Sequence, residues 1–169
     1  MDGVRVAWPE LTAGVQGQAA TQQIRDSHYS ITLHGDWAAR PGADNGQQTF
    51  YSRRLDTTAV ISSLGMSASR GELGKIAHML VELRLKAEAK AASEYKFGTT
   101  LTEPVVQSRP WGYLVAYYGS DTNGRHFAYA GVIIKSAVIS VYVDSPTASE
   151  NALAATMSRL MNDLEFDQG

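Results

Sequence analysis

Residues 111–143 read WGYLVAYYGSDTNGRHFAYAGVIIKSAVISVYV, and no other stretch constrains the architecture as strongly. Three strand-like runs follow one another here, at Trp111–Tyr118, Arg125–Lys135 and Ala137–Val143. The loop between the first two runs ends in Asn123-Gly124, residue types that tolerate the positive φ angles of a hairpin turn. Consecutive strands joined by short polar turns pair antiparallel. The stretch therefore predicts three neighbouring strands of an antiparallel sheet.

Further strand-like runs lie on the N-terminal side of this stretch. Apolar residues alternate at Tyr29–Leu33, and two more runs cover Thr49–Arg53 and Thr57–Ser63. A fourth run, Thr100–Gln107, contains Pro104, which has no N–H for a ladder hydrogen bond and so predicts an edge strand or a bulge. The pattern predicts seven strands in all.

Two amphipathic helices are predicted. The first spans about Gly71–Glu94, and Ser69 and Glu72 have the spacing of a capping box at its start. Its predicted buried stripe has three- and four-residue steps and consists of Leu73, Ile76, Ala77, Leu80, Leu83, Ala87 and Ala91. The second helix follows Ser145-Pro146, and its stripe consists of Leu153, Met157, Leu160, Met161 and Leu164.

The length and the element order predict one folded unit. A chain of 169 residues forms one ordinary domain, and 44% hydrophobic with 19% charged residues is typical of a globular protein. Residues 1–27, rich in Gly and Gln, are predicted to form an N-terminal arm or leader. Residues 28–169 are predicted to form a single α+β domain, with a mainly antiparallel sheet flanked by the two helices.

Composition argues against several partners. The 15 Lys and Arg against 17 Asp and Glu give a formal charge of −2, which is unfavourable for a protein that binds nucleic acid. The sequence contains no run of eighteen apolar residues, so we expect no membrane insertion. The chain has no cysteine and no spaced histidine pair, so we expect no metal and no cofactor. The N-terminus lacks a signal-peptide pattern, which predicts a cytoplasmic protein, or a periplasmic one if a signal has been removed.

No motif predicts an enzyme. A small hydrolase using His34, Asp36 and Ser67 is the catalytic alternative, and it requires the three side chains to lie within hydrogen-bond reach. The aromatic residues between Trp111 and Val143 instead indicate a protein-binding surface, because Tyr and Trp are enriched at binding hot spots. We expect contacts from the loop His34–Gly46 and the hairpin tip Ser120–Arg125. The predicted contact residues are Trp37, Arg40, Trp111, Tyr117 and Arg125, and the sequence leaves a homodimer open.

A family resemblance rests on the first strands. The stretch YSITLHGDW at Tyr29–Trp37, then Pro41-Gly42, then QTFYSRR at Gln48–Arg54, resembles the opening of the Mog1/PsbP-like superfamily, which includes DcrB-type bacterial domains. The resemblance extends over about residues 28–166. It implies an α/β/α sandwich, in which an antiparallel sheet lies between helices.

The resemblance also implies a function. Members of this superfamily are mostly non-catalytic, and they include photosystem accessory proteins, a GTPase-release factor, lipoproteins, and chaperones or immunity proteins of bacterial secretion systems. The absence of cysteine argues against the lipoprotein branch. The expected function is therefore a non-catalytic binding protein, most specifically an immunity protein that neutralises a bacterial toxin of a type VI-like secretion system. A secretion chaperone or accessory factor is the alternative.

Overall fold

A computed structural model describes residues 21–41 and 46–168. The strands that precede the long helix are β1 (Thr21–Arg25), β2 (Tyr29–His34), β3 (Trp37–Arg40), β4 (Gln47–Ser52) and β5 (Thr57–Gly65). A 3₁₀ turn at Arg70–Glu72 leads into α1 (Leu73–Tyr95). The remaining elements are β6 (Thr99–Leu101), β7 (Val105–Arg109), β8 (Gly112–Asp121), β9 (His126–Ile134), β10 (Ala137–Ser145), α2 (Glu150–Asn162) and β11 (Leu164–Phe166).

These strands form two antiparallel sheets. The large sheet has eight strands in the order β3-β4-β5-β10-β9-β8-β6, and β7 pairs with β8 beside β6. The small sheet has three strands in the order β1-β2-β11. Strand β10 pairs with β5 along its whole length, from Ala137 opposite Gly65 to Asp144 opposite Thr58. Because β5 precedes α1 in sequence and β10 follows it, this pairing joins the parts of the chain before and after the long helix.

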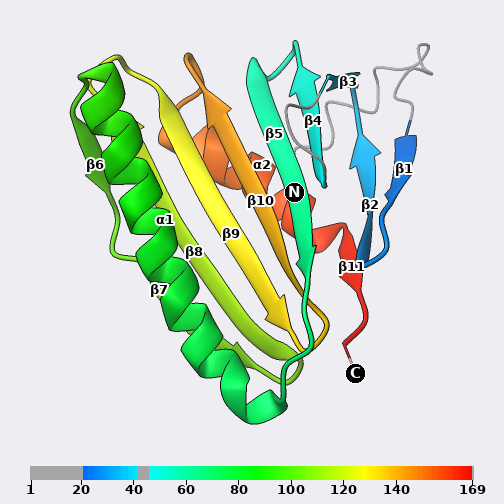
Figure 1. Cartoon of the computed structure of the whole chain (residues 1–169). Helices are drawn as coiled ribbons and strands as arrows, with labels where there is room; N and C mark the ends of the chain where they lie inside the picture. Colours follow the sequence, from blue (N-terminus) through cyan, green and yellow to red (C-terminus); the bar gives the residue numbers. More distant parts are fainter. Residues whose placement is uncertain (1–20, 42–45, 169) are drawn as a thin grey trace.

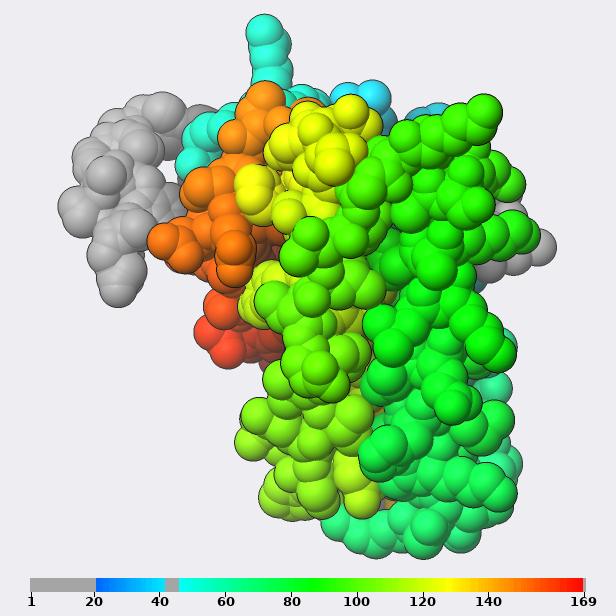
Figure 2. Space-filling view, turned by 90° about the vertical axis from the view of Figure 1, so that its left-hand side faces the viewer, coloured from blue at the N-terminus to red at the C-terminus, as the bar shows by residue number. Residues whose placement is uncertain are grey.

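The large sheet is covered on both sides, but unequally (Figure 1). On one side α1 lies over β8 and β9; on the other side α2 and the small sheet pack together. Figure 2, seen from the β6–β7 edge, shows the two helices on opposite sides of the sheet. Strand β9 is buried on both faces, as its unbroken apolar run Ala128–Ile134 requires. The architecture is the predicted single α+β domain with a mainly antiparallel sheet.

The predicted strands are confirmed, and four elements refine the prediction. Residues 21–25, at the end of the predicted arm, form β1 and pair with β2. The predicted loop His34–Gly46 contains β3. The run Thr100–Gln107 is divided into β6 and β7, since Pro104 interrupts the pairing with β8. The chain then ends in β11, which the sequence did not predict.

The buried face of α1 differs from the predicted stripe. Leu83 was expected inside but is 61% exposed, whereas Glu88 is 8% exposed. Leu73, Ala77 and Glu88 are the buried residues of the helix, and Arg84 lies half-buried between them. The buried stripe therefore includes two charged side chains, Arg84 and Glu88, one helical turn apart.

Two leucines on α1 test this assignment. Leu80 is half-buried and packs against the cluster beneath the helix, while Leu83 is exposed. We expect Leu80→Ala to lower the free energy of unfolding by about 2 kcal/mol, because it removes buried methyl groups and leaves a gap. Leu83→Ala should change it by less than about 0.5 kcal/mol. Urea unfolding of both variants measures the difference, and equal losses would show that the helix faces are assigned wrongly.

Candidate interaction surface

Half of one sheet face is left open by the described helices. Along β10, and along β5 from Thr57 to Ser62, residues alternate between buried and half-buried positions. The buried set, such as Ile61 and Val141, belongs to the core beneath α2. The other set, such as Val138 and Tyr142, lies on the α1 side. Since α1 packs over β8 and β9, no helix within residues 21–41 and 46–168 lies on the α1 side of β10, β5, β4 and β3 (Figure 1).

We call this half-face the open face and define it by strand register. It comprises Val138, Ser140 and Tyr142 of β10, Thr58, Val60, Ser62 and Leu64 of β5, Gln47, Thr49 and Tyr51 of β4, and Ala38 and Arg40 of β3. Leu64, opposite Val138, is 71% exposed. Large exposed apolar side chains on a sheet face indicate a contact surface.

One flank of α1 forms a wall beside the open face. In Figure 1 the helix rises in front of the sheet, to the left of β10 and β5. In a right-handed helix seen this way, the residue just before an inward-facing one turns to the right, toward β10. Leu83 precedes Arg84, which contacts the sheet, so Leu83 lies on this flank, whereas Met79, two residues after the buried Ala77, faces away from the sheet. Leu83 is 61% exposed, and it extends the apolar surface of the open face onto the helix.

A buried polar cluster fixes α1 beside the open face. The Tyr117 hydroxyl donates to Glu88 Oε2 at 2.6 Å and accepts from Arg84 Nη2 at 3.1 Å. Arg84 Nη2 also lies 3.3 Å from Glu88 Oε2. Burial, together with the hydrogen bond to Glu88, raises the pKa of Tyr117 far above its ordinary value. The phenol therefore stays neutral and holds the two charged side chains of the helix on β8.

The cluster continues across the sheet to the open face. The Arg84 guanidinium lies 4.6 Å from the centre of the Tyr129 ring and 5.4 Å from that of Tyr142. Arg125 donates to the Tyr142 hydroxyl at 3.0 Å and to Asp144 at 2.9 Å. These contacts join α1, β8, β9 and β10 into one hydrogen-bonded and cation–π network, so the wall and the floor of the open face are rigidly connected.

The network predicts a loss of stability at alkaline pH. Burial, reinforced by the charge of Glu88, raises the pKa of Tyr142 to about 12. In the unfolded chain the same phenol ionises near pH 10. The contribution of Tyr142 to the free energy of unfolding is therefore fully present below about pH 10. It falls by about 2 kcal/mol as the pH rises towards 12. Urea unfolding between pH 9 and about pH 11.5 should show this decline, and Tyr142→Phe should reduce its slope. An unchanged slope in the variant would contradict the assignment.

The outer edge of the open face carries charges of both signs, from Arg40 and Asp56. The Arg40 guanidinium lies 4.7 Å from the centre of the Tyr51 ring, and Arg40 itself is exposed. Tyr51 donates to Asp56, whose second oxygen accepts from Thr147. The hydrogen bond from Thr147, followed by that from Tyr51, lowers the pKa of Asp56. The carboxylate is thus held by hydroxyl groups and keeps its negative charge, while the Arg40 guanidinium lies over the Tyr51 ring.

The structure separates the five predicted contact residues. Trp37, at 7% exposure, fills the core beneath α2, and Tyr117, at 2%, belongs to the buried cluster. Both were predicted as contact residues, but buried rings cannot reach a partner, so both residues are structural. Trp111 is half-buried, and the centre of its ring lies 4.9 Å from that of Phe166 in an edge-to-face arrangement. Arg125 is half-buried in the network, so Arg40 is the one predicted contact residue that is exposed.

The catalytic alternative is not supported by the geometry. Asp36 precedes Trp37, and Trp37 pairs with Ser52, which in turn pairs with the first residue of β5. Ser67, in contrast, lies just beyond the last residue of β5. Nine strand residues at about 3.3 Å each separate these positions by more than 25 Å. His34 Nε2 instead lies 3.5 Å from Asp163 Oδ2. The Asp36 carboxylate accepts hydrogen bonds from the Ser52 hydroxyl and the Arg54 backbone N–H. The hydrolase prediction is therefore wrong for these three residues.

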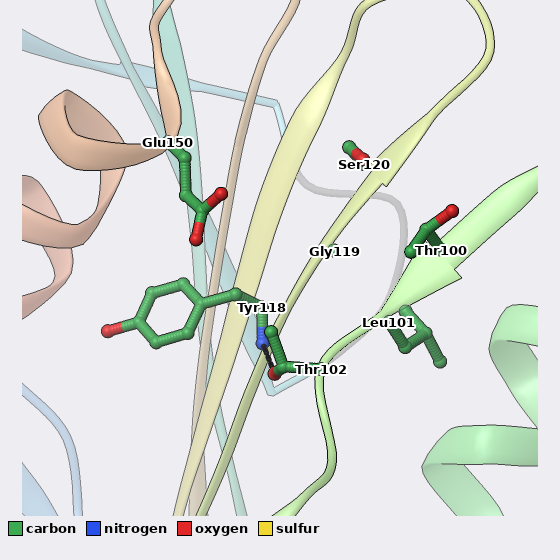
Figure 3. A pocket seen from close by; sticks show the side chains of 7 residues that line it. All are labelled: Thr100, Leu101, Thr102, Tyr118, Gly119, Ser120 and Glu150. Atoms are coloured by element: carbon green, nitrogen blue, oxygen red, sulfur yellow. Dashed lines mark hydrogen bonds between the residues drawn. The ribbon is translucent and has the colours of Figure 1, made fainter.

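A shallow pocket lies on the other side of the sheet (Figure 3). It is lined by Thr100, Leu101, Thr102, Tyr118, Gly119, Ser120 and Glu150. Thr102 Oγ1 accepts from the Tyr118 N–H at 2.9 Å, so this hydroxyl is used by the fold. Glu150 is the single carboxylate of the lining, and no nucleophile and base face each other across it.

The described residues were also searched for metal and membrane sites. In residues 21–41 and 46–168, no group of three or more His, Cys, Asp or Glu side chains could hold a metal ion. Within the same part of the chain, neither helix has the length and apolar character needed to cross a membrane.

Comparison with known proteins identifies the fold. No protein-family model and no curated protein matches the chain. The solution structure of cyanobacterial PsbP (CyanoP) from Synechocystis sp. PCC 6803 superposes with a TM-score of 0.66 at 13% identity, covering 92% of this chain and 98% of CyanoP. A crystal structure from Bacteroides thetaiotaomicron VPI-5482 superposes with a TM-score of 0.44 at 13% identity, over 82% of this chain and 45% of that one. This superposition does not establish a shared fold. The likeness to CyanoP shows that the chain has a PsbP-like α+β fold.

Proposed function

We propose that the chain is a non-catalytic protein-binding module whose partner contacts the open face. The observation that carries this proposal is the exposure of Leu64 and Leu83 beside one half of a sheet that is otherwise well covered. A floor of mixed polar and apolar side chains, a helical wall and a rigid network beneath them form a preorganised surface, and preorganisation reduces the entropic cost of binding.

The more specific proposal is an immunity protein that binds and neutralises a secreted bacterial toxin, in a type VI-like system. It is supported by the PsbP-like fold together with an accessible binding surface, and the toxin assignment rests on analogy between folds. A secretion chaperone or adaptor of the same fold is the second candidate. The proposed setting is the cytoplasm, or the periplasm if a signal has been removed, and neither role requires a cofactor or nucleic acid.

Capture from the native host, followed by a growth assay, tests the proposal. The tagged protein should retain one partner at a fixed stoichiometry, and Leu64→Glu/Leu83→Glu should lose it. Val105→Glu, which changes an exposed apolar residue on the far edge strand β7, is the matched control. Failure of the wild-type protein to retain any partner at micromolar concentration contradicts the binding function.

The captured protein then separates the two roles. If it arrests bacterial growth when expressed alone, and coexpression of this chain restores growth, the chain is an immunity protein. A stable complex with a partner that is harmless on its own contradicts immunity and leaves the adaptor role.

A further inference from the structure

We propose that the shallow pocket at the start of α2 binds a primary ammonium group on a short alkyl chain (Figure 3). The pocket lies on the α2 side of the sheet, whereas the open face lies on the α1 side. The inference therefore concerns a second site and does not rest on the proposed partner surface. Free alkylamines and lysine side chains both carry this chemical group.

Glu150 gives the pocket a negative charge that no described side chain neutralises. It is the first residue of α2, and Figure 3 shows its side chain reaching from the helix toward β8. Its carboxylate forms no ion pair or hydrogen bond with another described residue. No described lysine, arginine or histidine lines the pocket. Because a glutamate is ionised at neutral pH, the pocket attracts a cation and repels an anion.

The side-chain polar atoms of the pocket lining are all oxygens, which suits a hydrogen-bond donor. Thr100 and Ser120 face each other in register on β6 and β8, and neither hydroxyl is bonded to another described residue. Thr102 adds a third hydroxyl to the lining. An ammonium group has three N–H donors and no acceptor, so its donors match the carboxylate and hydroxyl oxygens.

A buried nitrogen beside the pocket also has no partner. Within residues 21–41 and 46–168, His126 Nδ1 is one of two buried side-chain polar atoms without a hydrogen bond. His126 pairs in register with Ser120, so the two side chains lie next to each other on the same side of the sheet. Buried polar atoms in folded proteins nearly always have a partner. A donor-rich ligand at Ser120 would therefore lie close to a nitrogen that accepts a hydrogen bond in one tautomer of neutral histidine.

The size and the apolar part of the pocket limit the rest of the ligand. The pocket has a volume of about 100 Å³. A water molecule needs about 10–15 Å³ of such a volume, so the pocket holds a group of fewer than about ten heavy atoms. Leu101 and the Tyr118 ring provide apolar surface, and a cation near the face of an aromatic ring is attracted to it. A butylammonium group fits these limits, whereas a nucleotide exceeds them.

Titration of the ¹⁵N-labelled full-length protein with n-butylammonium at pH 7 and low salt, followed by NMR, tests the inference. We expect saturable shifts of the amide signals of Leu101, Gly119 and Ser120, with a dissociation constant on the order of 1–10 mM. The uncharged analogue 1-butanol should bind at least about threefold more weakly, because it lacks the attraction to Glu150. Added salt should reduce this difference.

A matched pair of variants tests the role of the carboxylate. Glu150→Gln should weaken butylammonium binding at least about threefold, provided that the variant retains the wild-type melting temperature. Glu82→Gln makes the same chemical change on the exposed face of α1, on the other side of the sheet, and should alter the dissociation constant by less than about 1.5-fold.

A lysine derivative distinguishes the two sources of the ammonium group. Nα-acetyl-lysine methylamide that binds as tightly as n-butylammonium supports a site for a lysine side chain, whereas much weaker binding supports a site for a free amine. The absence of saturable shifts up to about 50 mM n-butylammonium would overturn the inference. Equally tight binding of 1-butanol, or wild-type affinity in Glu150→Gln, would also overturn it.

Discussion

Replacement of Arg84 by Met is expected to lower the free energy of unfolding by about 3 kcal/mol or more. The substitution retains much of the apolar stem but removes the guanidinium that neutralises Glu88, which is 8% exposed. Loss of one partner of a buried ion pair leaves an uncompensated charge, and such losses typically cost about 3–5 kcal/mol. The Tyr117 hydroxyl remains as the one hydrogen-bond donor described for the Glu88 carboxylate. Urea unfolding at neutral pH measures the loss.

The double variant Arg84→Met/Glu88→Leu is the control for this prediction. Apolar replacement of both partners removes the unpaired charge, so it should regain most of the stability. A single variant as stable as the wild type, or a double variant no more stable than the single one, would contradict a stabilising role for the cluster.

A glycine at the start of β8 should be equally sensitive. Gly112 has a φ angle of +151°, and a Cβ atom there would lie 1.9 Å from the backbone oxygen of Ile133 on β9. Backbone atoms in a central strand cannot move away cheaply, so Gly112→Ala should cost about 3 kcal/mol or more. Thermal and urea unfolding measure the effect.

Gly71 provides the matched control. Its Cβ would meet no atom within 4 Å, so Gly71→Ala should be neutral or slightly stabilising. If the two alanine variants were equally stable, the close approach of β8 and β9 at Gly112 would be wrong.

Local patterns predicted most of the fold. The hairpin of β8 and β9 was visible in Asn123-Gly124, where Gly124 has a φ angle of +85°. The capping-box spacing at Ser69 and Glu72 was also informative, although it caps the 3₁₀ turn just before α1. Such signals depend on residues close in sequence, and antiparallel hairpins follow from them directly.

Elements that depend on distant residues were not predicted. Strand β11 pairs with β2, bringing Phe166 opposite Tyr29, and a three-residue run has no periodicity of its own. Strand β3 forms because Trp37 pairs with Ser52 and fills the core, while the flanking turn residues predicted a loop. In both segments, contacts with residues distant in sequence, and not the local pattern, determine that a strand forms.

The candidate surface was predicted only in part. Leu83 was assigned to the interior because helical spacing alone does not reveal that Arg84 and Glu88 occupy the buried face. One signal was available: Tyr117 and Tyr129 lie on neighbouring strands, and buried phenol groups require hydrogen-bond partners. Arg40, predicted as a contact residue, is exposed, and its contact with a partner stays a prediction. The open face results from sheet width and helix placement, which no local pattern contains.

Hydroxyl-radical footprinting of the free protein and its partner complex, read by mass spectrometry, tests directly whether the open face binds the partner. Oxidation rates at Leu64 and Leu83 should fall at least about threefold in the complex, because contact removes these side chains from water. The rate at Val105, which is 45% exposed on the far edge strand, should not change. Unchanged rates at Leu64 and Leu83, with protection confined to α2, the small sheet or the β6–β7 edge, would contradict the assignment of the open face as the binding surface.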